Sequence, residues 1–192
     1  MQAGYNNVIV HIEKLFNDEL VTDSGFKLYL DPSYNPEQHS TIHGTVVSVP
    51  NWKNCPGYWD LQVGDKIYFN YMVVLQPENR IDDLFIVEAP LCIARVRAGE
   101  LKPLGNYILL RPIVETTEKI GMIYIPEIAQ KKKLDKGIVV ASNLEDTKAG
   151  DTVVFNKIGK FENVIEGEIL YCAMNNNLFI KCPPKKRKKT KA

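Results

Sequence analysis

Few residues of this 192-residue chain have the types and spacing that catalysis or metal binding requires. His39 and His43 are separated by three residues, a spacing seen in metal sites, but no cysteine or second ligand pair accompanies them in their polar segment. Asp82 and Asp83 are adjacent, and adjacent residues of a strand point to opposite faces of the sheet. We therefore interpret the histidines as solvated loop residues and the aspartates as a charged turn.

Glycine spacing excludes the common nucleotide-binding and nucleophile motifs. The closest two of the twelve glycines are Gly99 and Gly105, six positions apart. The G-x-G-x-x-G, G-x-S-x-G and Walker motifs all need glycines closer than that, so that the backbone can approach a phosphate or present a nucleophile. We therefore expect no enzyme activity, and no cofactor or metal bound by this chain.

The cysteine spacing and the charge distribution are those of a globular protein with a basic C-terminal segment. The four cysteines form no C-x-x-C pair, which favours reduced thiols in a cytosol over a zinc ribbon or a disulfide framework. Six of the last eight residues are Lys or Arg, so the rest of the chain is acidic. We expect residues 183–192 to be a disordered tail. No apolar run approaches the ~20 residues of a membrane span, and no signal peptide is visible, so we expect a cytoplasmic protein.

The chain contains an internal repeat of short, β-prone segments. Three segments recur in the same order: Asn6–Val10 as Asn106–Leu110, His43–Val47 as Lys136–Val140, and Val63–Asn70 as Ala149–Asn156. Each copy is rich in Val, Ile, Tyr and Phe between turn residues, without long helical periodicity. This pattern predicts an all-β fold of two tandem, partly closed β-barrels, residues 1–97 and 98–182, because closure removes unpaired sheet edges.

The repeated Gly-Asp pair has a structural interpretation. Gly64 and Gly150 each precede an aspartate and then a strand. We expect both glycines at turns that need positive φ, with the aspartates accepting hydrogen bonds from nearby backbone amides.

Three ordered motifs of the second copy indicate a family. Leu101–Pro112, Gly121–Pro126 and Lys136–Val140 are similar to K-P-L-G-D-R-V-L-V, G-G-I-V-L-P and R-G-E-V-L of the ten-kilodalton co-chaperonins, the GroES-like lids of group I chaperonins. The first copy resembles the family more loosely, from about Tyr5 to Val96. The tandem layout resembles plastid double-domain co-chaperonins. The short Val140–Gly150 connection resembles the roofless co-chaperonin of T-even phages, which implies the host cytoplasm if the chain is phage-encoded.

The segment between the first two strands of each copy carries one apolar triplet in polar surroundings. In the second copy the triplet is Ile123-Tyr124-Ile125, and in the first it is Leu28-Tyr29-Leu30. Such a segment buries little surface, so we expect it to be mobile when free. The resemblance implies that these triplets dock in an apolar groove of the chaperonin. Met122 replaces a family glycine and Phe26-Lys27 is inserted, and an ordinary barrel strand stays an alternative for each triplet.

The resemblance implies a co-chaperonin that caps a group I chaperonin ring and assists ATP-dependent folding of an unfolded client. The resemblance then implies that ATP is bound by the partner chaperonin and not by this chain. The family's subunits form a homo-oligomeric ring in which one closing strand meets the next subunit's opening strand. Because the connection from Val96 to Pro103 is short, fusion is expected to make one such contact intrachain.

Two other function classes share features with this sequence. Medium-chain dehydrogenases carry a GroES-like domain, but this sequence has no glycine motif or length for their nucleotide-binding domain. The basic tail leaves open a nucleic-acid-binding β-barrel. The first copy also inserts Trp52, Tyr58 and Trp59, which could plug a roof, contact the client or cover a barrel end.

Overall fold

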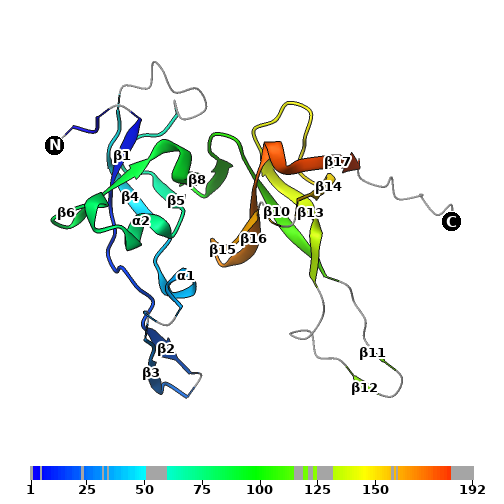
Figure 1. The fold of residues 1–192 in the computed structure, drawn as a ribbon, viewed down its shortest axis with the longest axis horizontal. Helices are drawn as coiled ribbons and strands as arrows, with labels where there is room; N and C mark the ends of the chain where they lie inside the picture. The colour runs from blue at the N-terminus through cyan, green and yellow to red at the C-terminus, as the bar shows by residue number, and fades with distance from the viewer. Residues whose placement is uncertain are drawn as a thin grey trace. The chain divides into compact units, whose positions relative to one another are not determined.

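The computed structural model describes residues 2–4, 6–22, 24–31, 33, 35–50, 60–114, 119–120, 123–124, 132–156, 158 and 160–182. The chain divides into two compact units, Met1–Gly105 and Asn106–Ala192 (Figure 1). Each unit is built around one antiparallel sheet, and the helices are single turns. The predicted all-β class is confirmed.

The first unit contains a seven-stranded sheet in the order β6-β7-β1-β4-β5-β8-β9. Its strands are β1 (Asn7–His11), β4 (His43–Ser48), β5 (Lys66–Phe69), β6 (Arg80–Ile81), β7 (Leu84–Glu88), β8 (Cys92–Arg97) and β9 (Glu100–Pro103). The short helices are α1 (Pro36–His39), α2 (Met72–Leu75), η2 (Pro77–Asn79) and η3 (Ala89–Leu91). A separate two-stranded ribbon, β2 (Glu19–Val21) and β3 (Lys27–Tyr29), projects away from this sheet (Figure 1).

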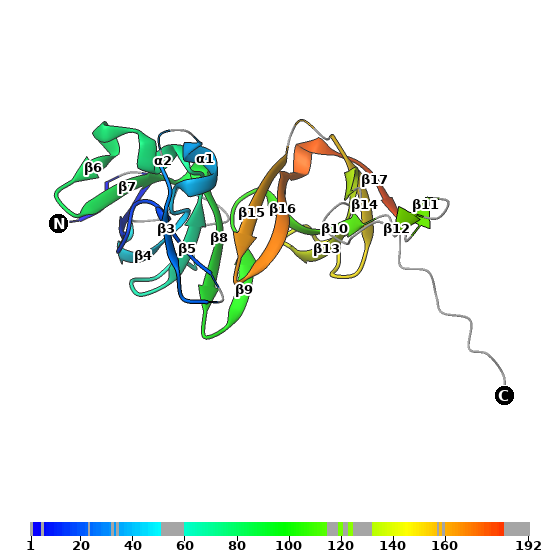
Figure 2. The ribbon, with the colours of Figure 1, turned by 90° about the horizontal axis from the view of Figure 1, so that it is seen from below.

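The second unit contains a six-stranded sheet in the order β15-β16-β10-β13-β14-β17 (Figure 2). Its strands are β10 (Tyr107–Val114), β13 (Lys132–Ser142), β14 (Thr152–Phe155), β15 (Lys160–Ile165), β16 (Glu168–Met174) and β17 (Leu178–Cys182), with η5 at Asn175–Asn177. A separate pair, β11 (Lys119–Ile120) and β12 (Ile123–Tyr124), lies in the chain between β10 and β13.

The two sheets share their strand order. Taken in chain order, the first six strands of one sheet occupy the same places as the six of the other. Register irregularities also recur, at Ile9/Val10 and Leu109/Leu110 and again at Tyr68/Phe69 and Val154/Phe155. Each sheet ends in two edge strands within the described residues, so the sheets are open there and no closed barrel forms.

Strand β9 is the additional strand of the first unit. It follows the domain boundary that we drew after residue 97, yet it pairs antiparallel with β8, with Ala94 opposite Pro103. The two-residue turn between them, Ala98-Gly99, has positive φ at both positions. The compact units therefore divide after Gly105.

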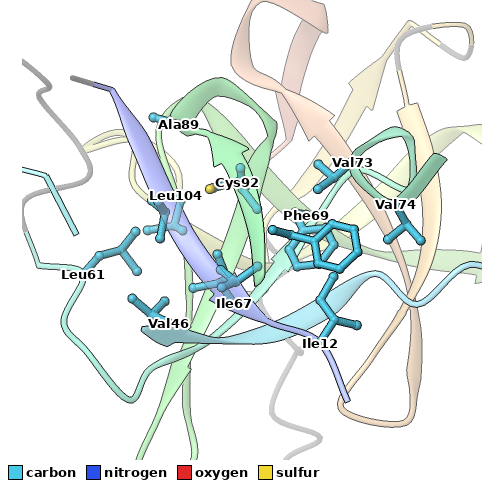
Figure 3. Packing of buried hydrophobic residues seen from close by; sticks show 14 residues of the cluster. Ile12, Val46, Leu61, Ile67, Phe69, Val73, Val74, Ala89, Cys92 and Leu104 are labelled. Atoms are coloured by element: carbon cyan, nitrogen blue, oxygen red, sulfur yellow. The ribbon is translucent and has the colours of Figure 1, made fainter. Parts of the chain in front are cut away.

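Alternating apolar residues build a hydrophobic core in each unit. Leu104, which follows β9, is fully buried in the first core beside Leu61, Ile67 and Cys92 (Figure 3). The members of the second core are Ile108, Leu110, Val139, Val153, Phe155, Tyr171 and Ala173. The rings of Phe155 and Tyr171 meet edge to face, with centroids 5.9 Å apart.

The Gly-Asp turns form as predicted. Gly64 and Gly150 both have φ of +92°, a region that glycine enters without strain. The next residue is buried in each case, and its Oδ2 accepts a backbone hydrogen bond, from Gln62 to Asp65 at 2.9 Å and from Lys148 to Asp151 at 3.0 Å. This prediction is confirmed.

Candidate functional site

Between β1 and β4, a segment of the first unit extends outside the main sheet. We call residues 18–30 of this segment the first arm. Its root is held by backbone hydrogen bonds between the chain that enters and the chain that returns. The Asn17 N–H donates to the His39 carbonyl at 2.6 Å, and the Thr41 N–H donates to that of Leu15 at 2.8 Å. The arm therefore starts from a fixed base on the sheet.

The arm itself is a regular antiparallel ribbon. Leu20 lies opposite Leu28 in the β2–β3 register, and the Leu30 N–H extends the ladder toward the root by donating to the Asp18 carbonyl at 2.7 Å. Across the ribbon, Lys27 Nζ lies 3.4 Å from Glu19 Oε2. We expected this segment to be mobile when free, with an ordinary strand as the alternative. The structure describes a hairpin outside the main sheet, whose backbone groups find partners within the arm.

Four apolar side chains of the first arm are exposed to solvent, on both sides of the ribbon. Val21, Phe26, Leu28 and Tyr29 are 59%, 64%, 43% and 76% exposed. A two-stranded ribbon has no second layer against which to bury them. The arm thus offers apolar surface that another molecule could cover, at about 25 cal/mol for each Å² removed from water.

The predicted site residues fall on these ribbons. Leu28 and Tyr29 lie in β3, and Leu30 follows it and is half-buried. Ile123 and Tyr124 form β12, opposite Ile120 and Lys119. Ile125 lies outside the described residues. None of the five described residues belongs to a main sheet.

Two apolar residues of the first arm were missed by the sequence prediction. Val21 is in β2 and Phe26 stands beside the turn. The signal that could have found them is the short β-prone run Glu19-Leu20-Val21 ahead of a Ser-Gly turn, which predicts a hairpin partner for the triplet.

A polar cavity of about 270 Å³ lies at the root of the first arm. Its lining is His11, Glu13, Lys14, Asn17, Thr41, His43, Gly44, Thr45 and Lys66. Both signs of charge occur, and Lys14 Nζ is paired with Asp18 Oδ1 at 2.6 Å. His43 packs on the Tyr68 ring with centroids 5.6 Å apart. In the part of the chain that the structure describes, no three His, Cys, Asp or Glu residues gather as metal ligands.

The buried cysteines of the described residues are poorly suited to reaction. Cys92 and Cys172 are buried free thiols. Burial raises the pKa of each thiol to about 12, so the nucleophilic thiolate is scarce near neutral pH. Among the described helices, none has the length and apolar character to span a membrane.

Comparison with known proteins adds the decisive observation. Residues 100–181 match the family model described as Chaperonin 10 Kd subunit. The Co-chaperonin GroES of Fervidobacterium nodosum is 35% identical over 72 residues, which cover 36% of this chain and 81% of that protein. The chain belongs to the chaperonin 10 kDa family.

Two further relatives have similar sequence identity and coverage. The Co-chaperonin GroES of Sulfurovum sp. is 36% identical over 80 residues, covering 41% of this chain and 92% of the relative. The Co-chaperonin GroES of Thermosipho africanus is 39% identical over 70 residues, which cover 34% of this chain and 78% of that protein. The family match begins at Glu100, the first residue of β9, so the matched region includes the strand that completes the first sheet.

The family region ends in a strand whose apolar residues are exposed. Phe155 lies opposite Leu178 as Phe69 lies opposite Cys92, so β17 occupies the place of β8. On β8, the next two residues are fully buried, with β9 alongside. On β17, Phe179 and Ile180 are 66% and 57% exposed, and β17 is an edge strand within the described residues.

Proposed function

We propose that this protein is a co-chaperonin that caps a group I, GroEL-like chaperonin ring and assists ATP-dependent folding of an enclosed client. Its relatives carry the name Co-chaperonin GroES. The observation that carries the proposal for this chain is the first arm, which holds four exposed apolar side chains on a ribbon outside the sheet. In this proposal ATP is bound by the partner, and the chain acts as a binding protein.

The arms dock by covering their apolar side chains. Burying one Leu or Ile side chain is worth about 2 kcal/mol, and the translational and side-chain freedom lost on docking offsets part of it. One arm therefore binds weakly and releases readily. Several arms on one assembly act together and hold the lid in place while each contact stays reversible.

The proposal includes a tandem arrangement of two GroES-like domains. It is supported by the shared strand order, the shared irregularities and the shared Gly-Asp turns of the two units. Both triplets, Leu28–Leu30 and Ile123–Ile125, are the proposed docking residues. The short stretch between β13 and β14 supports a roofless, phage-type second domain.

Copies of the chain join through β17 in this proposal. The segment that precedes β1 of a second copy pairs with the β17 edge, as β9 pairs with β8 within the first unit. The contrast between buried Ile93 and Ala94 on β8 and exposed Phe179 and Ile180 on β17 supports this contact. Repetition of one head-to-tail contact closes a homo-oligomeric ring when the rotation permits.

The test is a double variant that removes the apolar tip of each arm. Leu28→Asp with Ile123→Asp should lower capture by a GroEL-type ring plus ATP by about tenfold or more, because a carboxylate cannot enter an apolar groove without losing its hydration. Native gels or co-sedimentation measure capture.

The matched control places the same charge on exposed apolar residues outside the arms. Val63→Asp with Val164→Asp should be captured like the wild-type protein. Equal capture of the arm variant and the wild type, with both proteins folded by circular dichroism, would refute the proposed docking residues.

A further inference from the structure

Hydrogen bonds at the tip of the first arm converge on Thr22. Its N–H donates to the Phe26 carbonyl at 2.9 Å, and its Oγ1 accepts from the Phe26 N–H at 3.1 Å. Its carbonyl accepts from the Gly25 N–H at 2.8 Å, and its hydroxyl lies 2.9 Å from Ser24 Oγ. Gly25 has φ of +80°, which lets the turn close without strain. Thr22 thus uses its N–H, its carbonyl and its hydroxyl to close the ribbon.

Among the side chains of this ribbon that the structure describes, polar contacts form and no apolar core does. All four apolar side chains named above are exposed, and the Lys27–Glu19 pair is a surface contact of small energetic value. An isolated two-stranded hairpin is only marginally stable in water. Loss of one well-placed hydrogen bond therefore shifts the ribbon markedly toward open conformations.

Resting on the proposed function, we propose that Thr22 is a positioning residue that closes the first arm into a hairpin before it docks. The arm then meets the chaperonin groove as a preformed ribbon, and little backbone entropy is lost on binding. The apparent affinity of a segment falls with the fraction that holds the binding-competent form. Thr22 touches no partner in this scheme and acts only through the shape of the arm.

The ribbon's geometry explains why shape matters for docking. Leu28 lies on one face of the ribbon, and Val21 and Tyr29 lie on the other with Glu19 and Lys27. Opening the tip releases this register, so Val21 and Tyr29 no longer share a face. A one-residue slip would move each of them to the opposite face.

The experiment compares Thr22→Val with Thr22→Ser in the full-length protein. Valine keeps the shape and loses the hydroxyl, whereas serine keeps the hydroxyl. Hydrogen exchange of the free protein reports on closure: valine should reduce protection of the Phe26 and Leu30 amides several-fold, and serine should retain it. Thr45→Val, the same change at an exposed position of β4, should leave both amides unchanged.

Binding kinetics with a GroEL-type ring and ATP complete the test. Thr22→Val should weaken capture several-fold with slower association, while Thr22→Ser and Thr45→Val bind like the wild type. Wild-type affinity for Thr22→Val, or unchanged amide protection in it, would overturn the role of Thr22. Absence of capture of the wild-type protein would instead overturn the proposed function, so the two failures are distinguishable.

Discussion

Asp65 connects two distant parts of the first unit. Its Oδ1 and Oδ2 accept hydrogen bonds from Nε and Nη2 of Arg97, each at 2.6 Å, in addition to the Gln62 amide. Burial alone would raise the pKa of this carboxyl, but the hydrogen bonds from Arg97 and Gln62 outweigh it and hold the pKa below the ordinary value of 3.8. The ionised carboxylate is therefore the form that the fold favours.

A pH dependence follows from the direction of this shift. A carboxyl whose pKa is lower in the folded state stabilises the fold above about pH 4, and that contribution is lost as the pH falls through the folded-state pKa. Asp65→Asn should lower the free energy of unfolding at pH 7 by about 2 kcal/mol and weaken its acid dependence. Urea unfolding at pH 7 and pH 3 measures both effects. Asp82→Asn, at an exposed turn, is the control, and an Asp65→Asn variant with wild-type acid dependence would contradict the assignment.

At this scale the sequence predicted local contacts and missed distant ones. The positive φ of Gly64 and the amide bond to Asp65 follow from the Gly-Asp pair itself. The partner Arg97 is 32 positions away, and no local pattern relates the two residues. The same holds for Asp60, which accepts hydrogen bonds from Arg95 at 2.8 Å and Lys102 at 3.0 Å.

Among the elements, β9 has an unexpected place. It opens the region that matches the family model, but it completes the sheet of the first unit. Leu104, directly after it, is fully buried in the first core, and its N–H donates to the Ile93 carbonyl at 2.8 Å. The first unit therefore depends on residues that the repeat assigns to the second copy.

Truncation of Leu104 tests this dependence. Leu104→Ala should destabilise the first unit by about 3 kcal/mol, through lost burial and the cavity left behind. Hydrogen exchange in urea of first-unit amides, such as that of Phe69, which donates to the Ile42 carbonyl, follows the unfolding of this unit. Leu101→Ala, a half-buried position on β9, should cost less than about 1 kcal/mol. If Leu104→Ala lowers the free energy of unfolding as little as Leu101→Ala does, the first unit does not depend on Leu104.

The arms show which features a hydrophobic pattern can predict and which it cannot. The apolar triplets identified both ribbons, because a β-prone triplet in polar surroundings stands out. Closure of the first arm was not predicted, because apolar spacing alone does not reveal the hydrogen bonds between Thr22 and Phe26 on which closure depends. The Ser24-Gly25 turn was the available signal. Val21 was missed for a related reason, as its strand has only three residues.

For the whole molecule, the repeat predicted two units and the β class, but not whether each sheet closes. Because the repeated segments keep their order along the chain, the two units are expected to share one strand order, and they do. Closure depends on how edge strands meet in space, and a sequence repeat contains no information on that. Strand β17 lies at such a sheet edge, and exposed edge strands that carry apolar residues commonly pair with another strand.

Self-association should therefore depend on β17. Phe179→Lys places a charge on the exposed edge, so it should reduce the assembly to single chains in light scattering after gel filtration. Phe26→Lys, at a similarly exposed phenylalanine of the first arm, should leave the assembly intact. Dissociation by Phe26→Lys but not by Phe179→Lys would place the contact between copies in the arm.

Electron microscopy of the full-length protein mixed with a GroEL-type chaperonin is the most direct test of the central claim, that this chain is a chaperonin lid. With ATP, the account predicts additional density capping the ends of the chaperonin rings, and without ATP the ends should be bare. Bare ring ends in the presence of ATP and excess protein would contradict it.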